Sequence, residues 1–217
     1  MEMSLARRQA MVDGQIRPNN VTDERLITAL LAVPREVFVP KALKGVAYVD
    51  EDILIGGGRY LMEPVVFARL LQAARIGPDD AVLDVGCGTG YSSAVLARLA
   101  SAVVALEVDP ELVRRANANL TELGVDNVAV VQGELREGCP AQGPYDVIFV
   151  NGAVEEAPVA LTQQLGEDGR MLLVERRNGV GKAMSYGRFK GNISRRELFG
   201  AQVPTLPGFE RKPAFVF

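Results

Sequence analysis

The sequence predicts an α/β fold with a doubly wound, mainly parallel sheet, an N-terminal helical extension and a C-terminal antiparallel hairpin. From residue 80 to residue 182, short apolar strands alternate with helices across short connections, which favours right-handed βαβ units. The 217 residues, 48% of them hydrophobic, suffice for one core. We therefore expect a single domain over 1–217, divided into a helical and glycine-loop region (1–64), a core (65–182) and a hairpin region (183–217).

The N-terminal region predicts two helical pieces within residues 4–33. Pro18 divides them, because a residue that precedes proline is pushed out of the α region. Thr22 is expected to cap the second piece, and Pro34 to end it. Residues 35–48 look irregular or briefly helical.

A glycine-rich stretch follows at residues 53–64. Three consecutive glycines at 56–58 predict a flexible or tightly bent loop, and Pro64 is suited to start a helix over 65–75. The loop is either a linker between the helical layer and the sheet or a cover over a ligand site. The acidic run 50–52 before it predicts a solvated turn.

The centre of the chain is the stretch from Ala81 to Gly90. Four of the first five residues are apolar, which fits a strand buried on both faces. Gly86, Gly88 and Gly90 lack a Cβ atom, so a ligand can approach the backbone N–H groups closely. A helix over 91–100 would point its N-terminus at that ligand.

The remaining elements follow the same alternation. Asp109 is expected to cap a helix over 110–123, and Gly124 to end it. The expected strands are 81–85, 102–107, 127–132, 145–151 and 170–175, then a hairpin of 184–190 and 193–203 around Gly191–Asn192, and a short strand over 214–217.

Composition narrows the function classes. The 24 Lys and Arg and 27 Asp and Glu are scattered and give a net charge of −3, so no nucleic-acid-binding surface is expected. No apolar run reaches the roughly 18 residues of a membrane span, and the first residues are too polar for a secretory signal. We expect a cytoplasmic protein that binds neither nucleic acid nor membrane.

The chain has no histidine and only two cysteines, Cys87 and Cys139. A Ser-His or Cys-His mechanism and a His-ligated metal are therefore excluded within this sequence, and two cysteines cannot complete a four-ligand zinc site. We expect no metal and two free thiols in a reducing compartment.

The glycine turn favours a nucleoside-like ligand without a pyrophosphate. Tyr91 stands where a dinucleotide-binding fingerprint needs its third glycine, and residues 181–183 read Gly-Lys-Ala rather than the end of a phosphate loop. Glu107 closes the second strand of the core, where a carboxylate can accept both hydroxyl hydrogens of a ribose diol. Glu134, past the third strand, is placed to accept a hydrogen bond from an adenine amino group.

These residues resemble the ordered motifs of class I S-adenosylmethionine-dependent methyltransferases. The motifs are Val82–Tyr91, Glu107, Gly133–Glu134 and Pro144–Val150. More narrowly, the chain is similar to protein-L-isoaspartate O-methyltransferases over most of its length; this rests on Met11–Asp13, Val33–Pro40, Ile55–Gly58, Pro64 and Gly86–Ser92. The resemblance implies a Rossmann-like class I methyltransferase fold, S-adenosyl-L-methionine as cofactor, and protein repair by carboxyl methylation of isoaspartyl residues.

The resemblance also implies a cofactor site. Its expected members are Asp84, Gly86, Cys87, Gly88, Thr89, Gly90, Glu107, Val108, Gly133, Glu134 and Asn151. Asp84 is expected near the sulfonium or amino end of the cofactor, or bonded to N–H groups of the loop. Glu134 replaces the aspartate that is usual in the family, which keeps the carboxylate but lengthens the side chain.

The substrate loop departs from the family pattern. Family members carry Gly-x-Gly-Gln-Thr-Ile-Ser-x-Pro, whereas residues 56–64 read Gly-Gly-Gly-Arg-Tyr-Leu-Met-Glu-Pro. Met62 stands where the family has a serine implicated in catalysis, and a thioether cannot donate a hydrogen bond. Arg59 either holds an acidic substrate in place of that serine or is simply exposed. The catalytic residue stays unassigned, with Gly57, Gly58, Arg59, Tyr60 and Met62 as candidates.

Carboxyl methylation suits a chain without histidine. A carboxylate acceptor is already ionised at neutral pH, so the protein mainly aligns the reactants and excludes water. The expected partner is a protein or peptide that bears a carboxylate, acted on by a monomer or weak homodimer. Two alternatives stay open: a methyltransferase with a different acceptor, and a catalytically inactive S-adenosylmethionine-binding protein.

Overall fold

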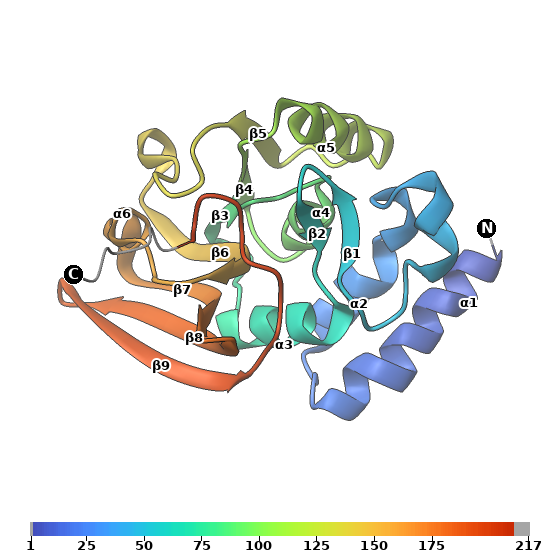
Figure 1. The fold of residues 1–217 in the computed structure, drawn as a ribbon, viewed down its shortest axis with the longest axis horizontal. Coiled ribbons are helices and arrows are strands. Elements are labelled where there is room, and N and C mark those ends of the chain that lie inside the picture. Colours follow the sequence, from blue (N-terminus) through green and yellow to red (C-terminus); the bar gives the residue numbers. More distant parts are fainter. Residues whose placement is uncertain (1, 211–217) are drawn as a thin grey trace, which may run out of the picture.

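A seven-stranded sheet forms the centre of the computed structural model, which describes residues 2–210 (Figure 1). Its strand order is β5-β4-β3-β6-β7-β8-β9, and β1 and β2 form a separate two-stranded hairpin. The strands are β1 Ile53–Gly56, β2 Arg59–Leu61, β3 Ala81–Val85, β4 Ala102–Glu107, β5 Val128–Gln132, β6 Tyr145–Val154, β7 Leu165–Arg177, β8 Val180–Phe189 and β9 Asn192–Gly200.

Six α-helices and five short turns of 3-10 or π helix precede or connect these strands within the described part of the chain. The α-helices are α1 Glu2–Met11, α2 Glu24–Ala32, α3 Pro64–Ala74, α4 Tyr91–Leu96, α5 Pro110–Glu122 and α6 Val159–Gln163. The short turns are η1 Val12–Ile16, η2 Arg17–Asn19, η3 Arg35–Val37, η4 Lys41–Val46 and η5 Pro140–Gln142. No helix among residues 2–210 is long and apolar enough to cross a membrane.

The sheet confirms the predicted topology. Strands β5, β4, β3, β6 and β7 pair in parallel, and β8 and β9 add two antiparallel pairs. β7 and β8 extend further than predicted because their pairing continues to Arg177 and Val180, beyond the apolar residues that marked them in the sequence. β9 ends at Gly200 rather than at Val203. The strand predicted over 214–217 lies outside the described residues.

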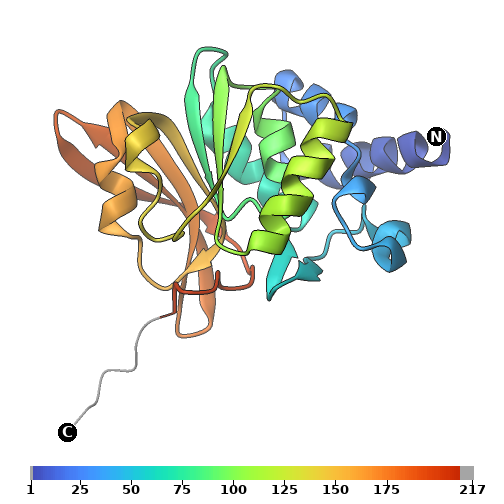
Figure 2. The same ribbon diagram turned by 90° about the horizontal axis from the view of Figure 1, so that it is seen from above.

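The two faces of the sheet are covered unequally. Helices α2 to α4 pack on the face that carries Val82 and Phe149, and Ala116 of α5 packs on the same side against Ala105. The opposite face is covered by α6 and the segment around Phe209. Figure 2 shows α5 and the N-terminal helices on one side of the sheet and α6 on the other. A buried strand such as β3 is apolar on both sides for this reason.

The N-terminal helices correct one predicted cap. Asp23, not Thr22, caps α2, because its carboxylate accepts from the backbone N–H groups of Arg25 and Leu26 at 2.9 and 3.3 Å. The N–H of Thr22 is itself bound by the side chain of Gln72 at 2.6 Å. The predicted break falls at residue 20, whose backbone is left-handed.

Two further expectations change in detail. The helix expected over 91–100 is regular only to Leu96 and continues as turns. The acidic run is more than a solvated turn, because Asp52 accepts from the N–H of Glu63 at 2.9 Å and Asp50 from the N–H of Val65 at 3.0 Å. These carboxylates satisfy donors at the start of α3, which a helix N-terminus leaves without partners. The sequence did not reveal these bonds, because 11 and 15 residues separate the partners.

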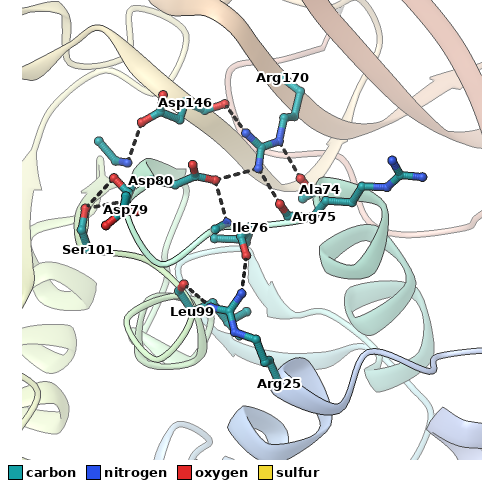
Figure 3. Close-up of polar contacts among 12 residues, drawn as sticks. Arg25, Ala74, Arg75, Ile76, Asp79, Asp80, Leu99, Ser101, Asp146 and Arg170 are labelled. Carbon is teal, nitrogen blue, oxygen red and sulfur yellow. Dashed lines mark hydrogen bonds and ion pairs between the residues drawn. The ribbon is translucent and has the colours of Figure 1, made fainter.

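Arg170 joins the N-terminal ends of the central strands to the end of α3 (Figure 3). Its guanidinium donates to the carbonyls of Ala74 at 2.6 Å and Arg75 at 2.8 Å, and to the carboxylate of Asp80 at 2.7 Å. A fourth bond reaches the carbonyl of Asp146 at 3.2 Å. The network closes the edge of the sheet that lies opposite the glycine turn.

Replacing Arg170 with alanine is expected to lower the free energy of unfolding by about 2–3 kcal/mol, because the helix-end carbonyls and Asp80 lose a shared donor. Urea unfolding followed by circular dichroism measures this. The control is Arg114→Ala, which removes an exposed pair with Glu111 and should leave the midpoint nearly unchanged. Equal midpoints for the two variants would contradict the role given to Arg170.

Candidate functional site

The glycine turn follows β3 at the C-terminal edge of the parallel strands, where α/β sheets commonly bind ligands. The N–H groups of Gly86 and Cys87 donate to the carbonyl of Leu106 at 2.8 and 3.1 Å, which ties the turn to β4. Gly86 and Gly88 have φ of 78° and 57°, a left-handed backbone that side chains disfavour. The turn therefore keeps the predicted shape.

Glu107 is the last residue of β4 and is completely buried. Its Oε2 accepts from the N–H of Gly88 at 2.8 Å, and its Oε1 from the N–H groups of Val108 and Asp109 at 2.9 and 3.3 Å. Three backbone donors thus hold one carboxylate directly beside the turn. Burial of a charge is costly, and a cation beside the carboxylate lowers that cost further.

Arg59 is that cation. Its Nη1 lies 3.1 Å from Oε1 of Glu107, and its Nη2 donates to the carbonyl of Gly86 at 2.6 Å. Its side chain is only 2% exposed. The expectation of an exposed arginine is therefore wrong, because the guanidinium is buried and points into the glycine turn.

The glycine-rich stretch forms an ordered cover over the turn. The expected loop is a hairpin of β1 and β2, with the left-handed Gly57 and Gly58 between them. The Cδ1 atom of Ile55 lies 2.6 Å from the point where a Cβ on Gly88 would stand. Arg115 of α5 donates to the carbonyl of Ile55 at 2.7 Å and holds the hairpin from the side. Of the two arrangements left open by the sequence, the structure has the cover, since the hairpin lies over the glycine turn.

Asp84 lies beneath the turn, within β3. Its Oδ2 accepts from the hydroxyls of Ser92 and Ser93, both at 2.6 Å, rather than from N–H groups of the loop. Desolvation by burial raises the pKa of Asp84 to about 6. Its other oxygen, Oδ1, is buried without a hydrogen-bond partner, as is Oδ1 of the neighbouring Asn151. The amide of Asn151 also donates to Ser92 at 2.8 Å, so the four residues form one cluster.

The other predicted residues divide into two groups. Val108 lies at the site, since its N–H bonds Glu107, and the N–H of Gly133 donates to the carbonyl of Glu107 at 3.0 Å. Thr89 turns away, because its hydroxyl donates to the carbonyl of Phe38 at 2.6 Å. Gly90 packs against α5 and not toward the hairpin, and the side chain of Glu134 is exposed. Cys87 and Cys139 are both free thiols, and burial raises the pKa of the Cys87 thiol.

A narrow cleft opens beside the hairpin. It is lined by Asp52, Gly58, Arg59, Tyr60, Met62, Asn151, Gly152 and residues 203–206. Met62 is buried, whereas Tyr60 is 37% exposed. Desolvation raises the pKa of Asp52 to about 6 and that of nearby Glu63 to about 7. The carboxyl groups at the base of the hairpin therefore hold protons more readily than ordinary ones.

Sequence reasoning missed Arg35, which is fully buried beneath the hairpin. It donates to the carbonyls of Ala47 at 2.7 Å and Met62 at 2.5 Å and lies 4.9 Å from the ring centre of Tyr91. Arg35 lies in the segment Val33–Pro40, which in the sequence served only as support for the family resemblance. No local signal marks this role, because both acceptors are backbone atoms distant in sequence.

The hydrogen-bonding groups of the site fit a nucleoside-like cofactor. Glu107 presents a carboxylate at the strand end, the glycines leave their backbone uncovered by Cβ atoms, and Asp84 and Asn151 keep one unpartnered acceptor each. The space directly above Gly86 and Gly88 is filled by side chains of the hairpin. No group of histidine, cysteine and carboxylate residues among residues 2–210 is arranged to hold a metal.

Asp84→Asn is expected to flatten part of the pH dependence of stability. Folded Asp84 keeps its proton to about pH 6, whereas the unfolded group loses it near pH 4. Between these values the folded state binds more protons, so the wild-type free energy of unfolding falls as pH rises and levels off above about pH 6. Urea titrations from pH 4 to 8 measure the free energy of unfolding of both proteins. The wild-type value minus the Asp84→Asn value should fall between about pH 4 and pH 6 and stay constant above.

The control for Asp84→Asn is Asp126→Asn, which removes an exposed carboxylate. Its difference from wild type should stay nearly constant over the same range. A pH-independent difference for Asp84→Asn would show that Asp84 titrates normally.

Comparison with known proteins identifies the family. Residues 6–199 match the family model described as protein-L-isoaspartate(D-aspartate) O-methyltransferase. The chain is 41% identical over 165 residues to the protein-L-isoaspartate O-methyltransferase of Methanoculleus marisnigri, and 42% identical over 166 residues to that of Koribacter versatilis. Each match covers 76% of this chain and 75% of the relative.

Solved structures agree on the fold. One protein-L-isoaspartate O-methyltransferase matches with a TM-score of 0.82 and 27% identity over 93% of this chain and 66% of that one. A Plasmodium falciparum chain described as a protein-L-isoaspartate O-methyltransferase, in complex with S-adenosyl-L-homocysteine, matches with a TM-score of 0.79 and 20% identity over 92% of this chain and 97% of that one. The predicted resemblance and class I fold are confirmed. The chain belongs to the protein-L-isoaspartate(D-aspartate) O-methyltransferase family, whose members are S-adenosylmethionine-dependent methyltransferases.

Proposed function

We propose that this chain transfers the methyl group of S-adenosyl-L-methionine to the free carboxylate of isoaspartyl residues in damaged proteins or peptides. The observation that carries the proposal is the placement of Glu107. A family-typical carboxylate closes β4 beside the glycine turn, in a chain that matches the family over residues 6–199. The same hairpin that departs from the family pattern covers this carboxylate.

Each cofactor residue has a role that its chemistry supports. Glu107 would accept the hydroxyl hydrogens of the ribose, and the exposed Glu134 those of an adenine amino group. The unpartnered oxygens of Asp84 and Asn151 suit the positively charged amino end. A buried acceptor without a partner costs free energy, so a donor from the cofactor would remove that cost.

The reaction needs no general base from the protein. When bound, S-adenosylmethionine supplies an electrophilic methyl group on a sulfonium. A carboxylate acceptor has a pKa near 4 and is already nucleophilic at neutral pH. The protein's contribution is therefore alignment and exclusion of water, to which the buried Met62 and Leu206 at the cleft contribute.

The acceptor side of the cleft differs from that of the family. Met62 replaces the family serine and cannot donate to a carboxylate, so the hydroxyl of the partly exposed Tyr60 is the side-chain donor that we assign to the acceptor. The pKa of Glu63, raised to about 7, reduces the negative charge near the cleft at neutral pH, whereas Asp52, with a pKa of about 6, stays mostly ionised there. Replacement of the serine also favours a second candidate, methyl transfer to a different acceptor.

The test is incubation of the protein with labelled S-adenosylmethionine and an isoaspartyl peptide, with the normal aspartyl peptide as matched control. We expect a base-labile methyl ester on the isoaspartyl peptide only. Label on another peptide class, stable to base, would establish the second candidate. Binding of S-adenosylhomocysteine without turnover on any peptide would leave an inactive cofactor-binding protein.

Glu107→Gln is expected to weaken S-adenosylhomocysteine binding by about tenfold or more, because the ribose diol loses a charged acceptor. Isothermal titration calorimetry measures the dissociation constant. Glu111→Gln, an exposed change four residues along the chain, serves as control and should bind as the wild type does. Because Glu107→Gln also removes the ion pair with Arg59, the comparison is repeated with Arg59→Gln present in both proteins. Equal affinities there would remove Glu107 from the cofactor site.

We also infer that the chain acts in the cytoplasm as a monomer or weak homodimer, on protein rather than nucleic acid. The two free cysteines and the scattered charges support this. Size-exclusion chromatography with light scattering at two concentrations tests the assembly.

A further inference from the structure

Arg59 binds the groups that the proposed function assigns to the cofactor. Its guanidinium spans the carbonyl of Gly86 at 2.6 Å and the carboxylate of Glu107 at 3.1 Å, and both side chains of this ion pair are almost fully buried. The resemblance places glutamine at this position in the family, so the positive charge is a feature of this chain.

The side chains of the hairpin fill the space above the glycine turn. A Cβ atom on Gly86 would stand 2.6 Å from Nη2 of Arg59, and one on Gly88 would stand 2.6 Å from Cδ1 of Ile55. Contacts this short leave no room for a ligand between the hairpin and these two glycines. Any molecule that lies against the turn must displace Arg59 and Ile55.

Glu107 also lacks the free acceptor sites that a diol requires. Its Oε1 already accepts from Arg59 and from the N–H groups of Val108 and Asp109, and its Oε2 accepts from Gly88. An ionised carboxylate offers about four acceptor sites in total. A ribose diol needs two of these acceptor sites. Displacement of Arg59 would free one of them on Oε1.

We propose that Arg59 is an intramolecular competitor for the cofactor at Glu107, so that the hairpin over 53–61 must open before S-adenosylmethionine binds. This inference rests on the proposed function. The fraction of molecules with an open hairpin then sets the measured affinity. For a ligand that binds only the open state, the apparent dissociation constant equals the intrinsic dissociation constant divided by that fraction.

The hairpin can open without breaking the central sheet. β1 and β2 pair with each other and are not strands of the central sheet. Within the described residues, the Arg59 contacts and the bond from Arg115 to the carbonyl of Ile55 are the polar contacts that join the tip to the body of the protein, and the buried side chains of Ile55 and Leu61 add apolar contacts that opening would also break. Asp52 and Asp50 fasten the base to the start of α3, so opening is confined to the tip.

The test is isothermal titration of wild type, Arg59→Gln and Arg115→Gln with S-adenosylhomocysteine, which does not depend on turnover. We expect Arg59→Gln, which restores the residue type of the family, to bind at least about tenfold tighter. Arg115→Gln loosens the hairpin while the ion pair remains, and should bind tighter to a smaller extent. The matched control is Arg114→Gln on the same helix, which changes an exposed arginine and should leave affinity unchanged.

The outcomes separate this inference from the proposed function. If wild type binds S-adenosylhomocysteine and Arg59→Gln binds no tighter, the competition is overturned while the proposed function stands. If wild type and both variants fail to bind at millimolar ligand, the inference and the proposed function both fall. Should Arg59→Gln not fold, as judged by circular dichroism, Arg115→Gln decides: unchanged affinity overturns the proposal and tighter binding supports it.

Discussion

The buried carboxylate of Glu107 is the constraint on which the site depends. A charge with no solvent contact destabilises the fold unless hydrogen bonds and an opposite charge compensate for lost hydration. Three backbone N–H groups from the glycine turn and the start of α5 supply part of this compensation, and Arg59 supplies the rest. The turn, the helix start and the hairpin are thereby held together by one side chain.

The sheet determines where this carboxylate lies. β4 runs parallel to β3, with Val85 beside Leu106, so the residue after each strand reaches the same edge. The carbonyl of Leu106 accepts from two N–H groups of the turn, which fixes the position of the turn relative to Glu107. The Arg170 network closes the opposite edge, where no ligand is expected. Stability and binding are therefore assigned to opposite ends of the same strands.

Much of this arrangement is predictable from sequence because its signals are local. Alternating strands and helices, the glycine turn and the spacing of Glu107 required only short-range patterns. The contacts of Arg59 and Arg35 were not predictable, because their partners lie 27 to 48 and 12 to 27 residues away and several are backbone carbonyls. The exchange of Thr22 for Asp23 as cap is a different error: both residue types cap helices, and sequence alone does not choose between neighbours.

The hairpin links the two halves of the reaction. Arg59 binds Glu107, to which we assign the cofactor, and it also lines the narrow cleft with Tyr60 and Met62, to which we assign the acceptor. In a strand, successive side chains point to opposite faces, which is why Arg59 of β2 is buried and Tyr60 is partly exposed. Under the proposed function, replacement of glutamine by arginine and of serine by methionine in this segment would alter cofactor access and acceptor contacts together. Opening the tip to admit the cofactor would also move Tyr60, which makes the order of binding a property of the hairpin and not of either site alone.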